Sequence, residues 1–286
     1  MTKENKDQII IRTVSDMQTY ARAARLRGES IGLVPTMGAL HAGHLSLVRR
    51  ARAENGKAIV SVFANPMQFD DPGDLARYPA TLDADARAAF GAGADAIFAP
   101  GEREMYPEGF STFVDMTGIS DRLCGASRPS HFRGVLTVVT KLFGICAPDR
   151  AYFGEKDAQQ LAIVKKMASE LCLNVEIIGC PTVREADGLA MSSRNARLGA
   201  DERISARCLF RALNEGKAIF ESGEADPGVL ASHIRSILEA EPRARIDYVG
   251  IVDPLTFETA PSVRAGNLIA LAVYIGDTRL VDNTKL

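Results

Sequence analysis

Short apolar segments alternate with longer, helix-like segments over the first two-thirds of the chain. In chain order, the apolar and helix-like segments are 31–34, 45–54, 58–63, 82–90, 96–99, 135–145, 151–153, 158–171 and 175–178. This alternation is typical of βαβ units, in which helices cover both faces of a parallel sheet. The pattern therefore predicts an α/β fold whose ligands bind beyond the carboxyl ends of the strands.

The rhythm changes after about residue 184. Two helical patterns, 201–221 and 227–239, precede strand-like segments at 247–252 and 268–274. With 286 residues, of which 46% are hydrophobic, the chain is long enough for two domains. We expect a Rossmann-like nucleotide-binding domain over residues 1–183 and a smaller α+β domain over residues 184–286, which acts as a lid.

The first strong strand leads into a helix through the sequence LVPTMGALHAGHLSLV, residues 33–48. We place His41, Gly43 and His44 in the connecting loop, beside a helix N-terminus that favours bound phosphate. The alternatives are a pair of exposed histidines or a metal site. A zinc site lacks a third ligand, because His131 and His233 occur at no ligand-like spacing. Phosphate contact is the preferred interpretation.

Three further segments carry side chains that suit a polar ligand. GEKDAQQ (154–160) and MSSRN (191–195) supply cationic, amide and hydroxyl donors of the kind that bind a polyphosphate, and NPMQF (65–69) supplies two amides. The alternatives are a solvated Lys156, a helix cap at Asp157, an N-cap within MSSRN, and an Asn65 that binds its own backbone. MSSRN lies between the two expected domains, where lid closure brings it onto a ligand.

Several other classes of site and partner are excluded. No segment fits the P-loop pattern, and GAGADA (91–96) follows a helix instead of a strand, so it is a helix end and not a dinucleotide fingerprint. A net charge of -2 argues against nucleic-acid or membrane surfaces, and no apolar run is long enough to span a bilayer. The five cysteines form no CxxC pair. We expect a cytoplasmic protein with mostly buried free thiols.

Taken in order, the motifs resemble those of the pantothenate synthetase (pantoate:β-alanine ligase) family, within the nucleotidyltransferase superfamily marked by HxGH loops. The matching segments are PTMGALHAGH, NPMQF, Tyr78-Pro79, SRPSHFRGV, FGEKDAQQL, DGLAMSSRN and IGDTRLVDN. The resemblance implies ATP-dependent condensation of D-pantoate with β-alanine through a pantoyl adenylate, with release of pyrophosphate and AMP. It also implies Mg²⁺ as the companion of ATP, and a homodimer.

The resemblance assigns roles to individual residues. The catalytic group comprises His44 as the family's proton donor, His41, Lys156 and Arg194. The ATP contacts comprise these four and Met37, Gly154, Asp157, Val183, Met191, Ser192 and Ser193. Pantoate contacts are Gln68 and Gln160, with Asn65, Tyr78, Arg128 and His131 as further substrate-binding candidates.

Three positions depart from the family pattern. Ala42 replaces a common acidic residue, Ala158 an aromatic, and Ala84 an acid that leaves Asp83 and Asp85 in its run. The last change weakens any assignment of a protein carboxylate to Mg²⁺, so no metal ligand is assigned.

One rival function is a nucleotidyltransferase with a phosphate acceptor, which calls for Arg or Lys where the amides stand. The other is a nucleotide-binding protein without chemistry, which needs fewer donors.

Overall fold

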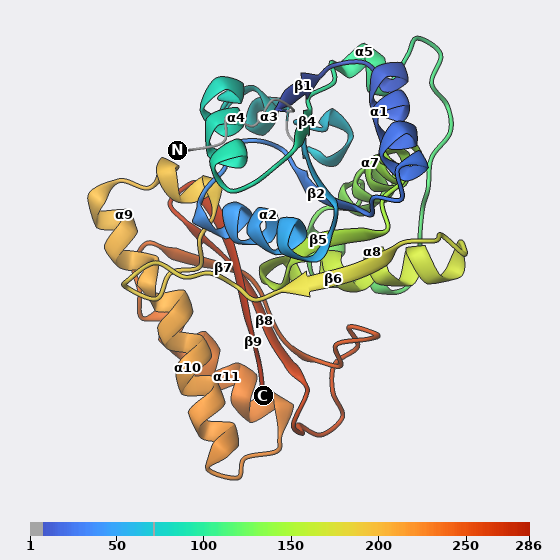
Figure 1. Cartoon of the computed structure of the whole chain (residues 1–286). Coiled ribbons are helices and arrows are strands. Elements are labelled where there is room, and N and C mark those ends of the chain that lie inside the picture. The colour runs from blue at the N-terminus through green and yellow to red at the C-terminus, as the bar shows by residue number, and fades with distance from the viewer. Residues whose placement is uncertain (1–7, 71) are drawn as a thin grey trace. The chain divides into compact units, whose positions relative to one another are not determined.

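The computed structural model describes residues 8–70 and 72–286. Its internal contacts divide the chain into two compact units, both formed from separate stretches of sequence (Figure 1). Unit 1 comprises Met1–Met116, Ser130–Gly154 and Ile163–Cys180, and unit 2 comprises Thr117–Pro129, Glu155–Ala162 and Pro181–Leu286. The division expected near residue 184 stays a prediction about the protein's domains.

Unit 1 is built on a six-stranded sheet with the strand order β1-β4-β3-β2-β5-β6, and every pairing is parallel. The strands are β1 (Ile9–Ile11), β2 (Ile31–Thr36), β3 (Lys57–Val62), β4 (Ala96–Phe98), β5 (Arg150–Gly154) and β6 (Glu176–Cys180). All five predicted strands are present. Strand β1 was missed, because an edge strand of three residues is too short to produce a pattern.

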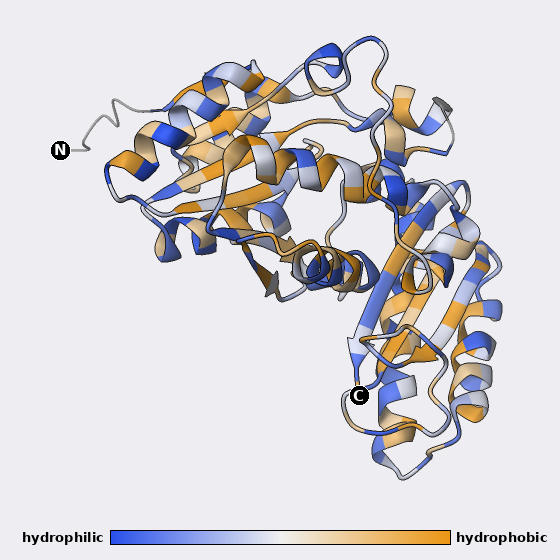
Figure 2. Ribbon diagram, turned by 90° about the vertical axis from the view of Figure 1, so that its right-hand side faces the viewer, coloured by the Kyte–Doolittle hydropathy of each residue, from blue (hydrophilic) through white to orange (hydrophobic). Residues whose placement is uncertain are grey.

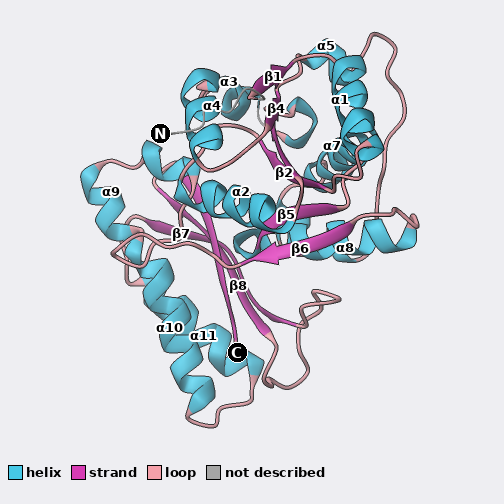
Figure 3. Ribbon diagram, viewed as in Figure 1, coloured by secondary structure: helices cyan, strands magenta, loops and turns pink. Residues whose placement is uncertain are grey.

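Helices cover both faces of this sheet (Figure 3). On one face α2 and α4 pack against β2, β3 and β4, and on the other α1 and α7 pack together over β2. The helical elements from residue 14 to residue 170 are α1 (Val14–Leu26), α2 (Ala42–Glu54), η1 (Pro66–Gln68), α3 (Pro72–Ala76), α4 (Leu82–Gly91), α5 (Glu102–Met105), η2 (Ile119–Asp121), α6 (Cys124–Ser127), α7 (His131–Cys146), η3 (Glu155–Asp157) and α8 (Ala158–Glu170). GAGADA is confirmed as a helix end, since α4 stops at Gly91 and Gly93 has a φ of 103°.

Unit 2 contains an antiparallel sheet in the order β7-β8-β9, with two longer helices beside it. Its elements from residue 193 onward are η4 (Ser193–Arg197), α9 (Ala200–Ser205), α10 (Arg207–Glu221), α11 (Pro227–Glu239), β7 (Ala244–Val252), β8 (Leu268–Ile275) and β9 (Thr278–Lys285). The predicted helix 201–221 is two helices, α9 and α10, and β9 was missed. With these corrections the predicted fold class is confirmed.

Hydrophobic residues are frequent in the strands of both sheets (Figure 2). In unit 1, Val34 and Val60 pack with Val48 of α2, and in unit 2, Leu213 and Leu271 belong to one buried cluster. Within residues 8–70 and 72–286, none of the helices combines the length and apolar character needed to cross a membrane. All five cysteines are free thiols, but only three of them are buried.

Strand β2 marks the point where the strand order of unit 1 reverses. From β2 the sheet continues through β3 and β4 on one side and through β5 and β6 on the other. In open α/β sheets, ligands bind outside the carboxyl ends of the strands at such a reversal. The segments that leave β2 and β5 are the HxGH segment and GEKD, two of the segments predicted to bind the ligand.

Candidate functional site

Two imidazoles form a capping box at the start of α2. His41 is the N-cap, and its Nδ1 accepts the N–H of Gly43 at 3.2 Å. His44 Nδ1 accepts the N–H of His41 at 3.4 Å, and the two ring centroids are 4.0 Å apart. Because each Nδ1 is an acceptor, each neutral ring carries its proton on Nε2. The helix therefore begins with two imidazole N–H donors at the positive end of its dipole.

The prediction that Gly43 and His44 lie in the loop was wrong, because the helix begins three residues earlier than expected. The helix was expected from residue 45, which left His44 in the loop, but α2 starts at Ala42. The reason is the spacing of the two histidines, which matches the N-cap and N3 positions of a capping box. Imidazoles here take the places that Ser or Thr and Glu or Gln usually occupy.

A buried carboxylate holds the loop between β2 and α2. Gly38 and Ala39 have positive φ angles of 92° and 51°. Asp85 is 3% exposed and accepts the N–H groups of Ala39 at 3.0 Å and Leu40 at 2.7 Å. The hydroxyl of Thr81 donates to the same carboxylate at 3.0 Å. Three donors therefore engage Asp85, and two of them belong to this loop.

The turn after β3 packs directly on α7. A Cβ atom at Gly134 would lie 2.2 Å from the carbonyl oxygen of Met67, so only glycine permits this approach. Asn65 is 1% exposed, and its Nδ2 donates to the Gly134 carbonyl and to Gln68 Oε1, both at 3.1 Å. His131 Nδ1 lies 2.9 Å from the Gln68 carbonyl oxygen. Both the backbone and the side chain of Gln68 are therefore held.

Two more predicted residues join this group in unit 1. Gln68 Nε2 donates to Met37 Sδ at 2.9 Å. The hydroxyl of Tyr78 donates to the Gly38 carbonyl at 3.3 Å, and its ring meets Phe69 edge to face. The predicted site residues found in unit 1 are Met37, His41, His44, Asn65, Gln68, Tyr78, His131 and Gly154.

In unit 2, a short antiparallel bridge brings Val183 and Met191 together. Arg184 pairs with Ala190, and the N–H of Met191 donates to the Val183 carbonyl at 2.9 Å. The Arg184 guanidinium forms two hydrogen bonds to Asp282, at 2.6 and 3.0 Å, and the Asp282 residue is only 2% exposed. A charge pair between the partly exposed Arg184 and the buried Asp282 carboxylate thus anchors the base of the MSSRN segment.

The MSSRN segment itself ends in a capped turn. Ser192 is the N-cap of η4, and its hydroxyl accepts the N–H of Arg194 at 3.3 Å. Asn195 donates to Glu185 Oε1 at 2.8 Å, and Arg203 pairs with that same carboxylate at 2.7 Å. The N-cap alternative is therefore confirmed for Ser192, and this capping contact holds the segment that carries Arg194.

Asn283 on β9 holds the segment that carries Lys156. Its Nδ2 donates to the carbonyl oxygens of Glu155 at 2.9 Å and Lys156 at 2.8 Å. The predicted site residues found in unit 2 are Arg128, Lys156, Asp157, Gln160, Val183, Met191, Ser192, Ser193 and Arg194.

The sequence predicted that the amides of GEKDAQQ bind a polar ligand, but the side-chain amide of Gln159 binds backbone groups instead. It is 6% exposed and binds backbone groups of the 119–124 segment. Its Nε2 donates to the carbonyls of Ile119 at 2.9 Å and Arg122 at 2.7 Å, and its Oε1 accepts the N–H of Cys124 at 3.1 Å. Gln159 is therefore a structural residue.

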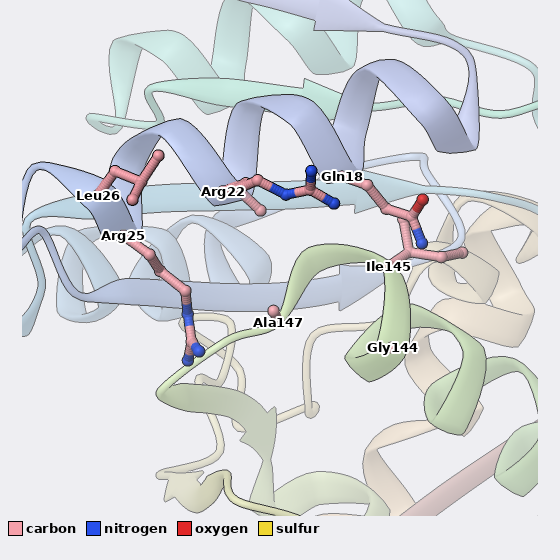
Figure 4. Close-up of a pocket in the computed structure, with 8 residues that line it drawn as sticks. Gln18, Arg22, Arg25, Leu26, Gly144, Ile145 and Ala147 are labelled. Atoms are coloured by element: carbon pink, nitrogen blue, oxygen red, sulfur yellow. The ribbon is translucent and has the colours of Figure 1, made fainter.

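One pocket lies apart from all these residues. It has a volume of about 420 Å³ and is lined by α1 and the end of α7, including Arg22, Arg25 and Ile145 (Figure 4). No predicted site residue lines it. Among the residues that the structure describes, no group of three or more His, Cys, Asp or Glu side chains could hold a metal ion.

Sequence reasoning gave no role to two residues that support the site, Asp85 and Asn283. Both lie within segments that resemble family motifs, TLDAD and IGDTRLVDN. Their contacts join segments 45 and 127 residues apart, so no local spacing reveals them. A polar residue inside an otherwise matched motif was the only available signal.

Comparison with known proteins gives one consistent family. The family model described as pantoate-beta-alanine ligase matches residues 9–285. A pantothenate synthetase of Moorella thermoacetica is 51% identical over 277 residues, covering 97% of this chain and 98% of that protein. One of Acetivibrio thermocellus is 50% identical over 274 residues, covering 96% and 98%.

Solved structures agree. The crystal structure of a pantothenate synthetase from Thermus thermophilus has a TM-score of 0.92 at 44% identity, covering 97% of this chain and 99% of that one. A pantoate-beta-alanine ligase from Francisella tularensis, solved with "Beta-gamma ATP" and β-alanine, has a TM-score of 0.80 at 35% identity and covers 97% of both chains.

Proposed function

The chain belongs to the pantoate-beta-alanine ligase family. We propose that the site residues named above bind the substrates and carry out both half-reactions of that activity. The enzyme joins D-pantoate to β-alanine at the expense of ATP and forms pantothenate, AMP and pyrophosphate. A carboxylate is a poor acyl donor because oxide is a poor leaving group. The reaction therefore passes through a mixed anhydride with AMP, the pantoyl adenylate.

In the first step, a carboxylate oxygen of pantoate attacks the α-phosphorus of ATP, and the bond to pyrophosphate breaks. Negative charge grows on the α-phosphoryl oxygens and on the leaving group. The Nε2–H groups of His41 and His44 donate to these oxygens, and the N-terminus of α2 adds its dipole. The capping box that orients both rings is the observation that carries this proposal.

The side chains of unit 2 supply the remaining phosphate donors. Lys156 and Arg194 add positive charge, and Ser192 and Ser193 add hydroxyls. The hold of Asn283 on the Lys156 carbonyl supports this role, because it limits the positions from which Lys156 reaches a ligand. The nucleotide itself is lined by Met37, Gly154, Asp157, Val183 and Met191.

Pantoate is bound by amides. Gln68 and Gln160 recognise its hydroxyl and carboxylate without adding charge, which leaves the carboxylate nucleophilic. The fixed backbone and side chain of Gln68 support its role. The further substrate-binding candidates are Asn65, Tyr78, Arg128 and His131. In the second step, the neutral amine of β-alanine attacks the acyl carbon, and a C–N bond forms. AMP leaves with the electrons of the C–O bond, and the nitrogen loses a proton to water.

Mg²⁺ is proposed as the companion of ATP. The Asp85 carboxylate does not fit as its ligand, because three donors already engage it. The ion would be held mainly through phosphate oxygens and water, and it would neutralise phosphate charge. We also propose a homodimer and a cytoplasmic location, both supported by the family resemblance.

The test is to incubate the pure protein with ATP, Mg²⁺, D-pantoate and β-alanine, and to follow AMP and pyrophosphate with each substrate omitted in turn. Steady AMP formation only with both organic substrates supports the ligase. ATP consumption that depends instead on a phosphate-bearing acceptor, with the nucleotide retained in the product, would establish the rival nucleotidyltransferase. ATP binding without turnover would establish a binding protein.

A further inference from the structure

A chain of hydrogen bonds leads from the ring of Tyr106 to Gln68. The Tyr106 hydroxyl donates to Asn65 Oδ1 at 2.7 Å, and Asn65 Nδ2 donates to Gln68 Oε1 at 3.1 Å. Tyr106 follows α5 and is 38 residues beyond Gln68 in sequence. No motif in the sequence points to it.

The donor and acceptor roles in these hydrogen bonds can be assigned in one way, which the Gly134 carbonyl decides. A carbonyl oxygen only accepts, so the Asn65 atom that lies 3.1 Å from it is the amide nitrogen. Asn65 Oδ1 therefore faces Tyr106, which must donate. The second hydrogen of the Asn65 amide faces Gln68, which must accept through Oε1. Gln68 consequently presents its NH₂ group, now bonded to Met37 Sδ, as a donor.

A donor at this point suits the oxygen atoms of pantoate. Its carboxylate and hydroxyl oxygens are much stronger acceptors than a thioether sulfur. A flipped Gln68 amide would present its oxygen to the pantoate carboxylate instead, and the two would repel. The orientation of this one amide therefore affects binding.

The surroundings of Tyr106 suit it to hold the Gln68 amide in that orientation. Its half-buried ring packs against Phe63 and Phe110, with centroids 6.0 and 5.0 Å away. Burial raises the pKa of its hydroxyl well above the usual range, so the group remains a donor at every physiological pH. Without this hydroxyl, the one donor to Asn65 Oδ1 that remains among the described residues is the N–H of Met67, at 3.4 Å.

We propose that Tyr106 is a positioning residue, which acts through Asn65 to fix Gln68 as a hydrogen-bond donor to pantoate. The inference rests on the proposed function, because that function makes Gln68 a pantoate contact. Loss of one buried hydrogen bond predicts that Tyr106→Phe raises the KM for pantoate by about five- to tenfold. The KM values for ATP and β-alanine stay unchanged.

Tyr152→Phe is the matched control. The Tyr152 hydroxyl makes two hydrogen bonds: it donates to Glu54 Oε2 at 2.8 Å and accepts from Asn55 Nδ2 at 2.7 Å. These partners lie at the C-terminal end of α2, opposite the histidines. This variant loses one hydrogen bond more than Tyr106→Phe does, and we expect its pantoate KM to equal that of the wild type.

A double-mutant cycle with Gln68→Ala decides whether Tyr106 acts through Gln68. We expect Gln68→Ala to raise the pantoate KM and Tyr106→Phe to add no further increase in that background. The proposal would be overturned if Tyr106→Phe raised the pantoate KM by the same factor in the wild-type and Gln68→Ala enzymes. A rise in the KM values for all three substrates would also overturn it. An active Gln68→Ala enzyme with an unchanged pantoate KM would also overturn it. Turnover of the wild type in the same assay tests the ligase function separately.

Discussion

Replacement of Gly134 by alanine tests the close packing of α7 on the turn after β3. The added Cβ would lie 2.2 Å from the Met67 carbonyl oxygen, a backbone atom that cannot move alone. Overpacking of this kind costs about 1–3 kcal/mol, and displacement of α7 also loses the Asn65 hydrogen bond to Gly134, worth about 1 kcal/mol. Helix propensity returns about 1 kcal/mol. The net expectation is a loss of about 1–3 kcal/mol in the free energy of unfolding.

Gly144→Ala in the same helix is the control. A Cβ atom there meets nothing within 4 Å, so only the propensity gain remains, and stability rises by about 0.5–1 kcal/mol. Urea unfolding followed by circular dichroism measures both variants. We also expect Gly134→Ala, and not Gly144→Ala, to raise the pantoate KM. A Gly134→Ala protein as stable as Gly144→Ala would refute the packing argument.

Three further predictions concern other contacts. His44→Ala should lower kcat by about 10²- to 10³-fold, while the ATP Kd, measured by titration calorimetry, changes little. Equal losses in turnover and in ATP affinity would exclude a transition-state role. Arg184→Met should destabilise the fold by about 3–5 kcal/mol in urea unfolding, because it leaves the buried Asp282 charge unpaired. Adding Asp282→Leu should restore much of the lost stability. An Arg184→Met protein as stable as the wild type would contradict this reasoning. Donation from Arg50 and Tyr152 lowers the pKa of Glu54 below its ordinary 4.5, so this contact stabilises the fold above that pH and is lost as the pH falls through the lowered pKa. Acid unfolding of the Glu54→Gln variant should lack the loss of stability that protonation of Glu54 causes in the wild type. An unchanged dependence of stability on pH would count against this role of Glu54.

Most of the fold follows from hydrophobic patterning. Strands β2 to β5 are largely buried on both faces, so they appear as apolar runs, and the helices between them have the matching period. The edge strand β6 is mostly partly exposed, but its isoleucines still mark it. The missed strands have a different character. Strand β1 has three residues, and β9 alternates buried and partly exposed positions in a polar sequence. It pairs with β8 as a hairpin across the two-residue turn Gly276-Asp277, so a local turn signal was present in the sequence and was not used.

The candidate site was predicted through its motifs, and the contacts that hold it were not. His44 and Lys156 stand in recognisable segments, so their residue numbers could be assigned from the sequence. Asp85, Tyr106 and Asn283 act on backbone or amide groups far away in the chain. Which polar side chain reaches which loop depends on packing distances that no periodicity encodes.

The interleaving of the two units limits how this chain can be cut or recombined. Residues 117–129 and 155–162 precede most of unit 2 in sequence, yet they belong to it. Asn283 binds carbonyls in the second of these stretches, and Arg122, in the first, pairs with Glu258. A fragment of residues 184–286 would therefore lack partners for its own side chains. A chimera that joins two relatives near residue 184 would mix two parents inside one unit, so shuffling at that point carries the cost of mismatched contacts.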